Sequence, residues 1–297
     1  MKLDKDKIYN IVNDSLDYFN INDLDYKNNC FNTINNLDNN TLDIINILYN
    51  SFYIKKASID IYRNKSIEEI FGKDIPFITN IMLLLGYSVY LDNISYLDNE
   101  QIIINKKRIY ETLTYDILIL KNNNLKIYHL LWGVRLLNIK IIEVGRLQYE
   151  IVNINPIDNS IGSFVKIHIP GSNKLIIEDV LKSLEDSKYY INKYFNIEIS
   201  DYYCSSWLLS PEVRNIVSND SNIAKFSDLF SIEKLLDGNK DILKFVFKTD
   251  CDDYSKLCEN TSLQKELKSM LINNVDIHIG VGKLKKCLIS NTLFLSK

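Results

Sequence analysis

The stretch Phe164-Val165-Lys166-Ile167-His168-Ile169-Pro170-Gly171 decides the fold class of this chain. Its polar and apolar residues alternate from Val165 to Ile169, which is typical of a half-buried strand, and the Pro-Gly pair ends that strand. From Leu175 to Tyr194 the apolar residues recur at helical spacing, which predicts a helix of about five turns. A strand that leads through a long helix to another strand is the crossover unit of a mixed α/β sheet.

Further strands and helices are predicted on either side of this unit. Residues 140–152 alternate as one long half-buried strand, and residues 202–208 form the strand that follows the long helix. Ser210-Pro211-Glu212 combines a cap, a first-turn proline and an early acid, which predicts the start of a short helix. The remaining predictions are strands at 226–232 and 243–248 and a helix at 261–271.

The first part of the chain has a different pattern, with apolar residues at helical spacing. Ile8, Val12, Leu16 and Phe19 form one such stripe, and Ser66 with Glu69 has the spacing of a capping box. The polar run 121–124 separates the two patterns, and 297 residues suffice for two domains of roughly 150 residues each. We therefore predict a helical domain over residues 1–125 and a mixed-sheet domain over 126–297, an α/β (α+β) fold.

Composition and charge exclude several classes of partner. With 35 Lys and Arg against 38 Asp and Glu, the net charge of −3 does not favour nucleic acid or an anionic membrane as a partner. The chain has 36 Asn, 19 Tyr and only 2 Ala, so its runs of Asn are a general bias rather than a sign of disorder.

The expected localisation of the protein and the redox state of its cysteines are inferred from signals that the sequence lacks. The N-terminal residues lack the apolar core of a secretory signal, and the longest apolar stretch, residues 81–91, is too short to span a membrane. Five scattered cysteines without a CxxC pair predict reduced thiols and no metal site. We expect a cytoplasmic protein that acts on a small molecule, and the sequence leaves its oligomeric state open.

Two residues near strand ends are candidates for proton transfer. His168 faces away from Ile167 and Ile169, and an imidazole there is either a general base or a structural side chain. Glu150 is the second candidate. Its carboxylate is either a base, a group that orients His168, or a solvated charge at the end of a strand.

The turn Ile169-Pro170-Gly171-Ser172-Asn173 is a candidate anion site. A helix N-terminus presents unpaired N–H groups and partial positive charge, which suit a pyrophosphate. The alternative is an ordinary connection from strand to helix.

The strand at 202–208 divides its side chains between two faces. Cys204 and Ser206 project one way, whereas Tyr203 and Trp207 project the other. Because no base lies near Cys204 in the sequence, we interpret it as a buried structural thiol. Trp207 is a core or pocket-wall residue. The lone histidines His129 and His278 are interpreted as structural.

Six blocks in order resemble one known family. They are Gly145–Glu150, Val165–Gly171, Cys204–Pro211, Ser221-Asn222-Ile223 with Lys225-Phe226, Lys244–Phe247 and Thr261–Gln264. The series is similar to bacterial acyltransferase domain-containing proteins, which join a helical N-acyltransferase N-terminal domain to a C-terminal domain of GNAT-like fold. The resemblance covers residues 126–297 well and the helical part in outline.

The resemblance implies transfer of an acyl group from a thioester, acyl-CoA or acetyl-CoA, to an amine or hydroxyl. Catalysis would fall to His168, Glu150 and Ser206, with Tyr203 and Trp207 at the substrate pocket. The donor would lie beside the strand that ends at Ile169, and the turn Pro170–Asn173 would meet its pyrophosphate.

One departure from the superfamily leaves an alternative function open. The usual pyrophosphate signature, Gln or Arg, two residues, Gly, one residue, then Gly or Ala, is missing after Ile169, and Gly280-Val281-Gly282 stands in a different context. Its absence favours the alternative, a non-catalytic GNAT-like module that binds a small molecule or a partner protein.

Overall fold

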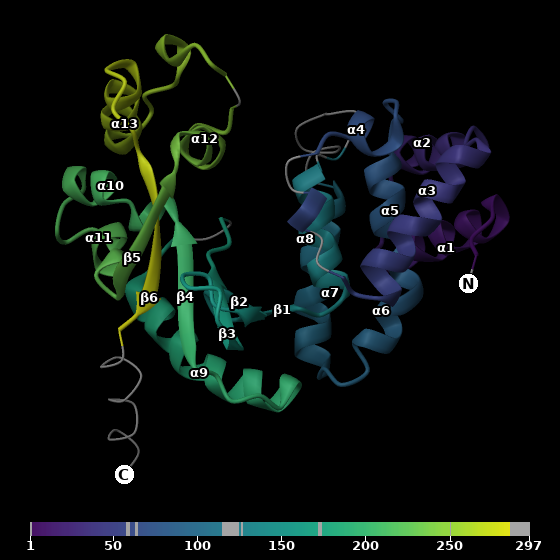
Figure 1. Cartoon of the computed structure of the whole chain (residues 1–297), viewed down its shortest axis with the longest axis horizontal. Coiled ribbons are helices and arrows are strands. Elements are labelled where there is room, and N and C mark those ends of the chain that lie inside the picture. The colour runs from purple at the N-terminus through teal and green to yellow at the C-terminus, as the bar shows by residue number, and fades with distance from the viewer. Residues whose placement is uncertain are drawn as a thin grey trace. The chain divides into compact units, whose positions relative to one another are not determined.

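The chain forms two compact units, Met1–Ile142 and Glu143–Lys297 (Figure 1). The structure, a computed structural model, describes residues 2–57, 60–62, 65–114, 125, 127–171, 174–249 and 251–285. The predicted linker at 121–124 lies outside the described residues. No helix within these ranges is both long and apolar enough to cross a membrane.

The first unit is helical, as predicted. Helix α1 illustrates why: Asp4 accepts a hydrogen bond from Lys7 N at 2.9 Å, and the stripe of Ile8, Val12 and Leu16 is buried. The elements of this unit are α1 (Lys5–Tyr18), α2 (Leu24–Asn35), α3 (Asn39–Tyr49), the π-helical turn η1 (Asn50–Ile54), the 3₁₀ turn η2 (Asp60–Tyr62), α4 (Ile67–Phe71), α5 (Ile78–Leu85), α6 (Tyr87–Asn93), α7 (Asn99–Thr114) and α8 (Ile127–Leu137).

The capping box at Ser66 is confirmed. Ser66 accepts from Glu69 N at 3.2 Å, and the Glu69 carboxylate accepts from Ser66 N at 2.6 Å. Helix α4 ends at Gly72, whose φ of 74° is the left-handed conformation that favours glycine. A local sequence signal therefore sets both ends of this short helix.

Buried tyrosines in the helical unit make hydrogen bonds through their hydroxyl groups. The hydroxyl of Tyr26 donates to the carbonyl of Leu113 at 3.2 Å and accepts from Asn80 Nδ2 at 2.7 Å. The hydroxyl of Tyr90 donates to Asn105 Oδ1 at 2.8 Å. The bias toward Tyr is therefore compatible with a core, because the buried hydroxyl groups of Tyr26 and Tyr90 are paired.

The units divide at Ile142/Glu143, later than the predicted 125/126. The reason is α8, which packs against α5, α6 and α7. Its buried face, including Leu130, Val134 and Leu137, completes the core of the helical unit.

The second unit contains a six-stranded sheet in the order β1-β2-β3-β4-β6-β5, whose first strand begins at Ile141, two residues before the boundary. Strands β3 and β4 are parallel, whereas the pairs β2–β3, β4–β6 and β5–β6 are antiparallel. The predicted mixed sheet is therefore confirmed. The strands are β1 (Ile141–Val144), β2 (Leu147–Ile154), β3 (Ile161–His168), β4 (Asp201–Ser206), β5 (Phe230–Asp237) and β6 (His278–Leu284).

Residues 140–152, predicted as one strand, form a hairpin instead. Gly145 adopts a φ of 57°, and this left-handed residue reverses the chain between β1 and β2. The alternation of apolar residues continues through the turn, which is why the pattern alone hides it.

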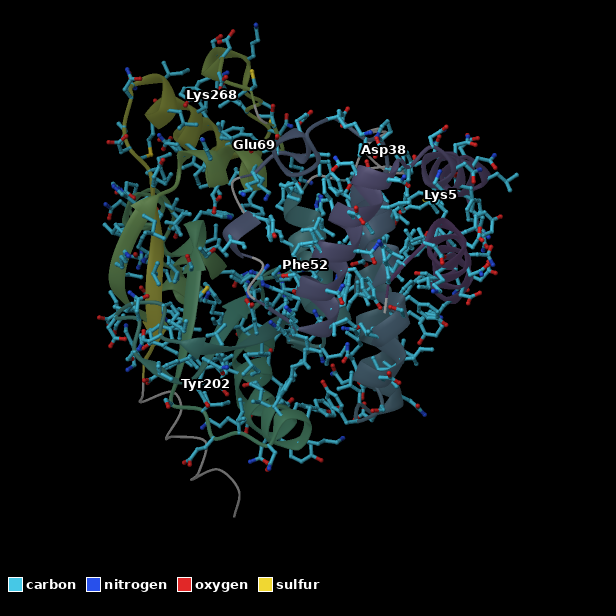
Figure 2. The ribbon with its side chains drawn as sticks, turned by 45° about the vertical axis from the view of Figure 1, so that its right-hand side comes forward. Lys5, Asp38, Phe52, Glu69, Tyr202 and Lys268 are labelled. Atoms are coloured by element: carbon cyan, nitrogen blue, oxygen red, sulfur yellow. The ribbon has the colours of Figure 1, made fainter. Side chains whose placement is uncertain are left out.

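Helix α9 (Ile177–Phe195) connects β3 to β4 and covers one face of the sheet. The hydroxyl of Tyr149 on β2 hydrogen-bonds Ser183 Oγ at 2.8 Å, and Tyr202 on β4, labelled in Figure 2, bonds Ser187 Oγ at 3.1 Å. The crossover helix predicted from the spacing of apolar residues is thus confirmed.

After β4 the chain turns through η4 (Trp207–Leu209), α10 (Pro211–Ile216) and α11 (Asn222–Ser227) before entering β5. The helix predicted at Ser210-Pro211-Glu212 is confirmed, and Ser210 accepts from Val213 N. The strand predicted at 226–232 begins only at Phe230, because Phe226 belongs to α11.

The strand predicted at 243–248 is wrong. Helix α12 (Asn239–Ile242) continues into the π-helical turn η5 (Leu243–Phe247). Ile242, Leu243 and Phe247 recur on one side of this turn and are buried against Leu267. The packing partner, helix α13 (Ser262–Ile272), confirms the helix predicted at 261–271; the 3₁₀ turn η6 (Tyr254–Lys256) precedes it.

Gly280 and Gly282 on β6 allow η4 to pack directly on the sheet. A Cβ atom added at Gly280 would lie 2.2 Å from the carbonyl oxygen of Leu209, and one at Gly282 would lie 3.0 Å from Leu209 Cδ1. These glycines therefore serve close packing of the backbone.

Gly280→Ala is expected to lower the free energy of unfolding of the C-terminal unit by about 1–3 kcal/mol, because the added methyl group overlaps a backbone atom. Urea unfolding followed by circular dichroism and tryptophan fluorescence measures the change. Gly171→Ala is the matched control, since its added Cβ meets nothing within 4 Å. Equal stability of both variants would contradict this packing role.

Candidate active site

The structure brings His168 and Glu150 together. His168 Nε2 lies 2.9 Å from Glu150 Oε2, across the antiparallel pair β2–β3. The Glu150 side chain is 10% exposed and the His168 side chain 30% exposed. A buried carboxylate beside a more exposed imidazole holds the ring in one orientation while the ring still meets solvent.

This pair lies on the face of the sheet opposite α9. In the register of β2 and β3, Gln148 is opposite His168 and Tyr149 is opposite Ile167. Tyr149 bonds α9, so the residues that alternate with it, Gln148 and Glu150, project to the other face. The same alternation puts His168 on that face beside Glu150.

The pair also lies where two parallel strands part. The last paired residues of β3 and β4 are Ile167 and Cys204, after which β3 ends at His168 and β4 continues beside β6 to Ser206. His168 therefore lies one residue beyond the last paired residues of β3 and β4.

Other polar side chains extend the same face toward β6. Tyr203, whose register partner is Lys166, accepts a hydrogen bond from Asn155 Nδ2 at 3.1 Å. Lys283 Nζ lies 2.8 Å from Asp201 Oδ2, and the hydrogen bond to that carboxylate raises the pKa of Lys283. Tyr203 is only 3% exposed, so it supports the face more than it contacts solvent.

The connection from β3 to α9 is longer than the sequence indicates. It runs from Ile169 to Ile176, and Lys174 O accepts a hydrogen bond from Arg146 Nε at 2.9 Å. Of the predicted anion site, Ile169, Pro170 and Gly171 lie in this connection, whereas Ser172 and Asn173 lie outside the described residues.

The N-terminus of α9 is poorly suited to a pyrophosphate. Its cap residue, Ile176, provides no side-chain hydrogen bond, and Glu178 and Asp179 occupy the first turn. These carboxylates compensate the helix dipole and repel a second anion. The first turn of α9 therefore does not favour a bound anion.

Ser206 does not join His168 and Glu150. It shares a face of β4 with Tyr202 and Cys204, the face that meets α9, and its Oγ accepts from Leu208 N at 3.1 Å. Its hydroxyl thus caps η4. Trp207 lies beyond the end of β4, in η4. Its side chain is partly buried against the cluster that includes Val213 and Ile242, so it does not share a strand with Tyr203.

A second imidazole–carboxylate pair was not predicted from the sequence. His278 Nδ1 lies 2.9 Å from Glu212 Oε1, and Glu212 Oε2 accepts from Ser210 Oγ at 2.7 Å. Burial raises the pKa of Glu212, but the hydrogen bonds from Ser210 and His278 outweigh it, so the net pKa is lowered. The partners are 66 positions apart in the sequence, so no local pattern indicates their contact.

The Ser210–Glu212–His278 cluster is not arranged as a nucleophilic triad. Ser210 is fully buried and bonds the carboxylate rather than the imidazole, so the ring is not placed to take its proton. The hydroxyl also caps α10. The cluster therefore joins α10 to the start of β6.

A groove in this unit lies away from the His168–Glu150 pair. It borders the last turns of α9 and the start of β4, whereas His168 ends β3. Because β3 and β4 are parallel, the groove and the pair are at opposite ends of the sheet. Its lining is Lys188, Asn192, Ile197, Glu198, Ile199, Ser200 and Tyr202.

Comparison with known families agrees with this geometry. A family model described as the GNAT-like C-terminal domain matches residues 141–284. Residues 141–284 form a GNAT-like domain. The match begins at the first residue of β1 and ends at the last of β6, so it spans the whole sheet. The resemblance seen in the sequence is thereby confirmed for the C-terminal unit.

Solved structures share the fold of both units. An acyltransferase in complex with decanoyl-CoA has a TM-score of 0.69 at 16% identity, covering 92% of this chain and 86% of that chain. A mutant acyltransferase with octanoyl-CoA has 0.70 at 15%, covering 92% and 87%. An acyltransferase with CoA and 10C-teicoplanin has 0.67 at 15%, covering 92% and 87%. No curated protein sequence matches the chain.

The cysteines of the GNAT-like domain differ sharply in expected reactivity. Burial raises the pKa of Cys204 to about 12, whereas Cys258 is exposed. At pH 8 a thiol with a pKa of 12 is ionised in only about one molecule in 10⁴, and the thiolate is the reactive form. Iodoacetamide at pH 8 is expected to label Cys258 and spare Cys204 in the native protein, as measured by peptide mass spectrometry.

Unfolding in urea provides the control, since both cysteines must then react. Rapid labelling of Cys204 in the native protein would contradict its burial and reopen a nucleophilic role.

Proposed function

We propose that this protein transfers an acyl group from acyl-CoA to an amine or hydroxyl of a small acceptor, with His168 as the general base. The observation that carries the proposal is the 2.9 Å contact between His168 Nε2 and Glu150 Oε2 where β3 and β4 part. The fold shared with acyltransferases in complex with decanoyl-CoA and octanoyl-CoA supports acyl-CoA as the donor.

The proposed step uses the imidazole twice. A neutral ring that donates Nε2–H to Glu150 has its lone pair on Nδ1, and this atom accepts the proton of the acceptor N–H or O–H. The acceptor atom then bonds the thioester carbonyl carbon, the C–S bond breaks, and the imidazolium returns the proton to the departing thiolate. Glu150 stabilises the transient positive charge on the ring.

The donor is proposed to lie along the end of β3 and the connection that follows it. Backbone groups of Ile169, Pro170 and Gly171 would meet the pantetheine and phosphates, together with Ser172 and Asn173. Because Glu178 and Asp179 occupy the first turn of α9, we assign the phosphates to the connection rather than to the helix N-terminus. Ser206 has no part in this step, since its hydroxyl caps η4.

One alternative is a non-catalytic module that binds a small molecule or a partner protein. The acidic first turn of α9 and the missing glycine-rich signature favour it. The two proposals differ in what His168 does. A base must affect turnover, whereas a structural imidazole affects only folding.

His168→Ala is expected to lower kcat by about 10²–10⁴-fold, the usual contribution of general-base catalysis, while leaving donor binding nearly unchanged. Glu150→Gln should lower kcat less, because the amide still orients the ring but no longer stabilises its charge. Release of free thiol from decanoyl-CoA, in the presence of a panel of primary amines and alcohols, measures the rate.

The Glu212–His278 pair provides the matched control. It has the same separation of 2.9 Å in the same unit, so His278→Ala should retain turnover within about tenfold of the wild type. Unchanged turnover in His168→Ala would remove the assignment of the base. Donor binding without thiol release in the wild type would favour the binding module.

A further inference from the structure

Strand β5 (Phe230–Asp237) forms one edge of the sheet. It pairs with β6 and is last in the strand order, so one side of its backbone faces outward. All of its residues after Phe230 are exposed. An eight-residue edge strand with outward-facing N–H and C=O groups is a template for pairing with another chain.

The side chains of this edge are unusually apolar for a free strand. Ile232, Leu235 and Leu236 are 39%, 43% and 40% exposed. Natural edges are commonly guarded by charged side chains, by proline, which cannot donate a hydrogen bond, or by bulges. Here the charged residues are Glu233 and Lys234, adjacent and of opposite sign, and Asp237 at the end of the strand.

These residues match a second copy of the same strand. In an antiparallel pair related by a twofold axis between positions 233 and 234, Glu233 is opposite Lys234 of the other copy. The same register puts Ile232 opposite Leu235 of the other copy. Because of the twofold axis, the Glu233–Lys234 contact and the Ile232–Leu235 contact each occur twice. Opposite charges and paired apolar residues across strands stabilise a sheet.

The β-bulge of β5 makes this register consistent with the faces of the sheet. The pairing with β6 shifts between Ile232 and Lys234, so Ile232 is opposite Gly282 and Leu235 is opposite Gly280. Because Gly280 and Gly282 are two residues apart, Ile232 and Leu235 project from the same face. A twofold axis perpendicular to the sheet preserves that face, so the two apolar side chains meet.

We propose that two copies of this chain associate through antiparallel pairing of β5 with β5, which continues one sheet across a symmetric dimer. An isologous contact of this kind must be self-complementary, and the sequence from Ile232 to Leu235 satisfies this condition in charge and in apolar character. The occupant of the edge is therefore a second copy rather than an unrelated peptide. This inference is independent of the proposed function.

Sedimentation velocity of the full chain, over a range of micromolar concentrations, tests the proposal. The wild type should reach twice the chain mass, and Glu233→Lys should raise the dissociation constant at least about tenfold, because two pairs of like charges then face each other. The double variant E233K/K234E restores both opposite-charge pairs and should restore the dimer. Recovery in the double variant also excludes misfolding as the cause.

Glu266→Lys on α13 is the matched control, with the same change in net charge at an exposed site outside β5. It should leave association unchanged. A monomer at all concentrations would overturn the proposal. A dimer that tolerates Glu233→Lys would also overturn it, since another surface would then carry the contact.

Discussion

The parallel pairing of β3 and β4 is the constraint on which the GNAT-like unit depends. Parallel neighbours require a crossover, and α9 provides it along one face of the sheet. Ser183 and Ser187 on α9 bond tyrosines of β2 and β4, so polar contacts fix the helix on that face. The opposite face is left to Glu150 and His168, and the separation of the sheet into a packed face and a polar face follows from the crossover.

The same constraint explains why the site occurs at one end of the sheet. Strand β3 ends at His168, one residue beyond its last pairing with β4, whereas β4 continues beside β6 to Ser206. That continuation needs room for η4, which Gly280 supplies by lacking a side chain. The parting of the strands, the close packing at Gly280 and the position of His168 are therefore parts of one arrangement. A carboxylate at 2.9 Å then gives the imidazole a fixed orientation.

Strong periodic patterns predicted the central elements of the fold, but they did not predict contacts between residues far apart in the sequence. The spacing of apolar residues was sufficient for α9, and the alternation around His168 was sufficient for β3. The patterns gave wrong predictions in two places. At 140–152 one left-handed glycine divides a continuous alternation, and at 243–247 a short apolar run fits a helix and a strand equally. Strand alternation placed Ser206 on a different face from Tyr203, but its cap on η4 and the contact of Glu212 with His278 arise only from the folded arrangement of the chain.

Calorimetric titration of the full chain with decanoyl-CoA tests the central claim most directly, because the proposed chemistry requires a donor at the parting of β3 and β4. We expect saturable binding, with a rise in melting temperature that reflects about 2.7 kcal/mol of added stability at 100 times the dissociation constant. We also expect weaker binding when the connection at residues 170–173 is altered. Absence of binding at millimolar donor would contradict the account and leave a GNAT-like domain without its acyl donor.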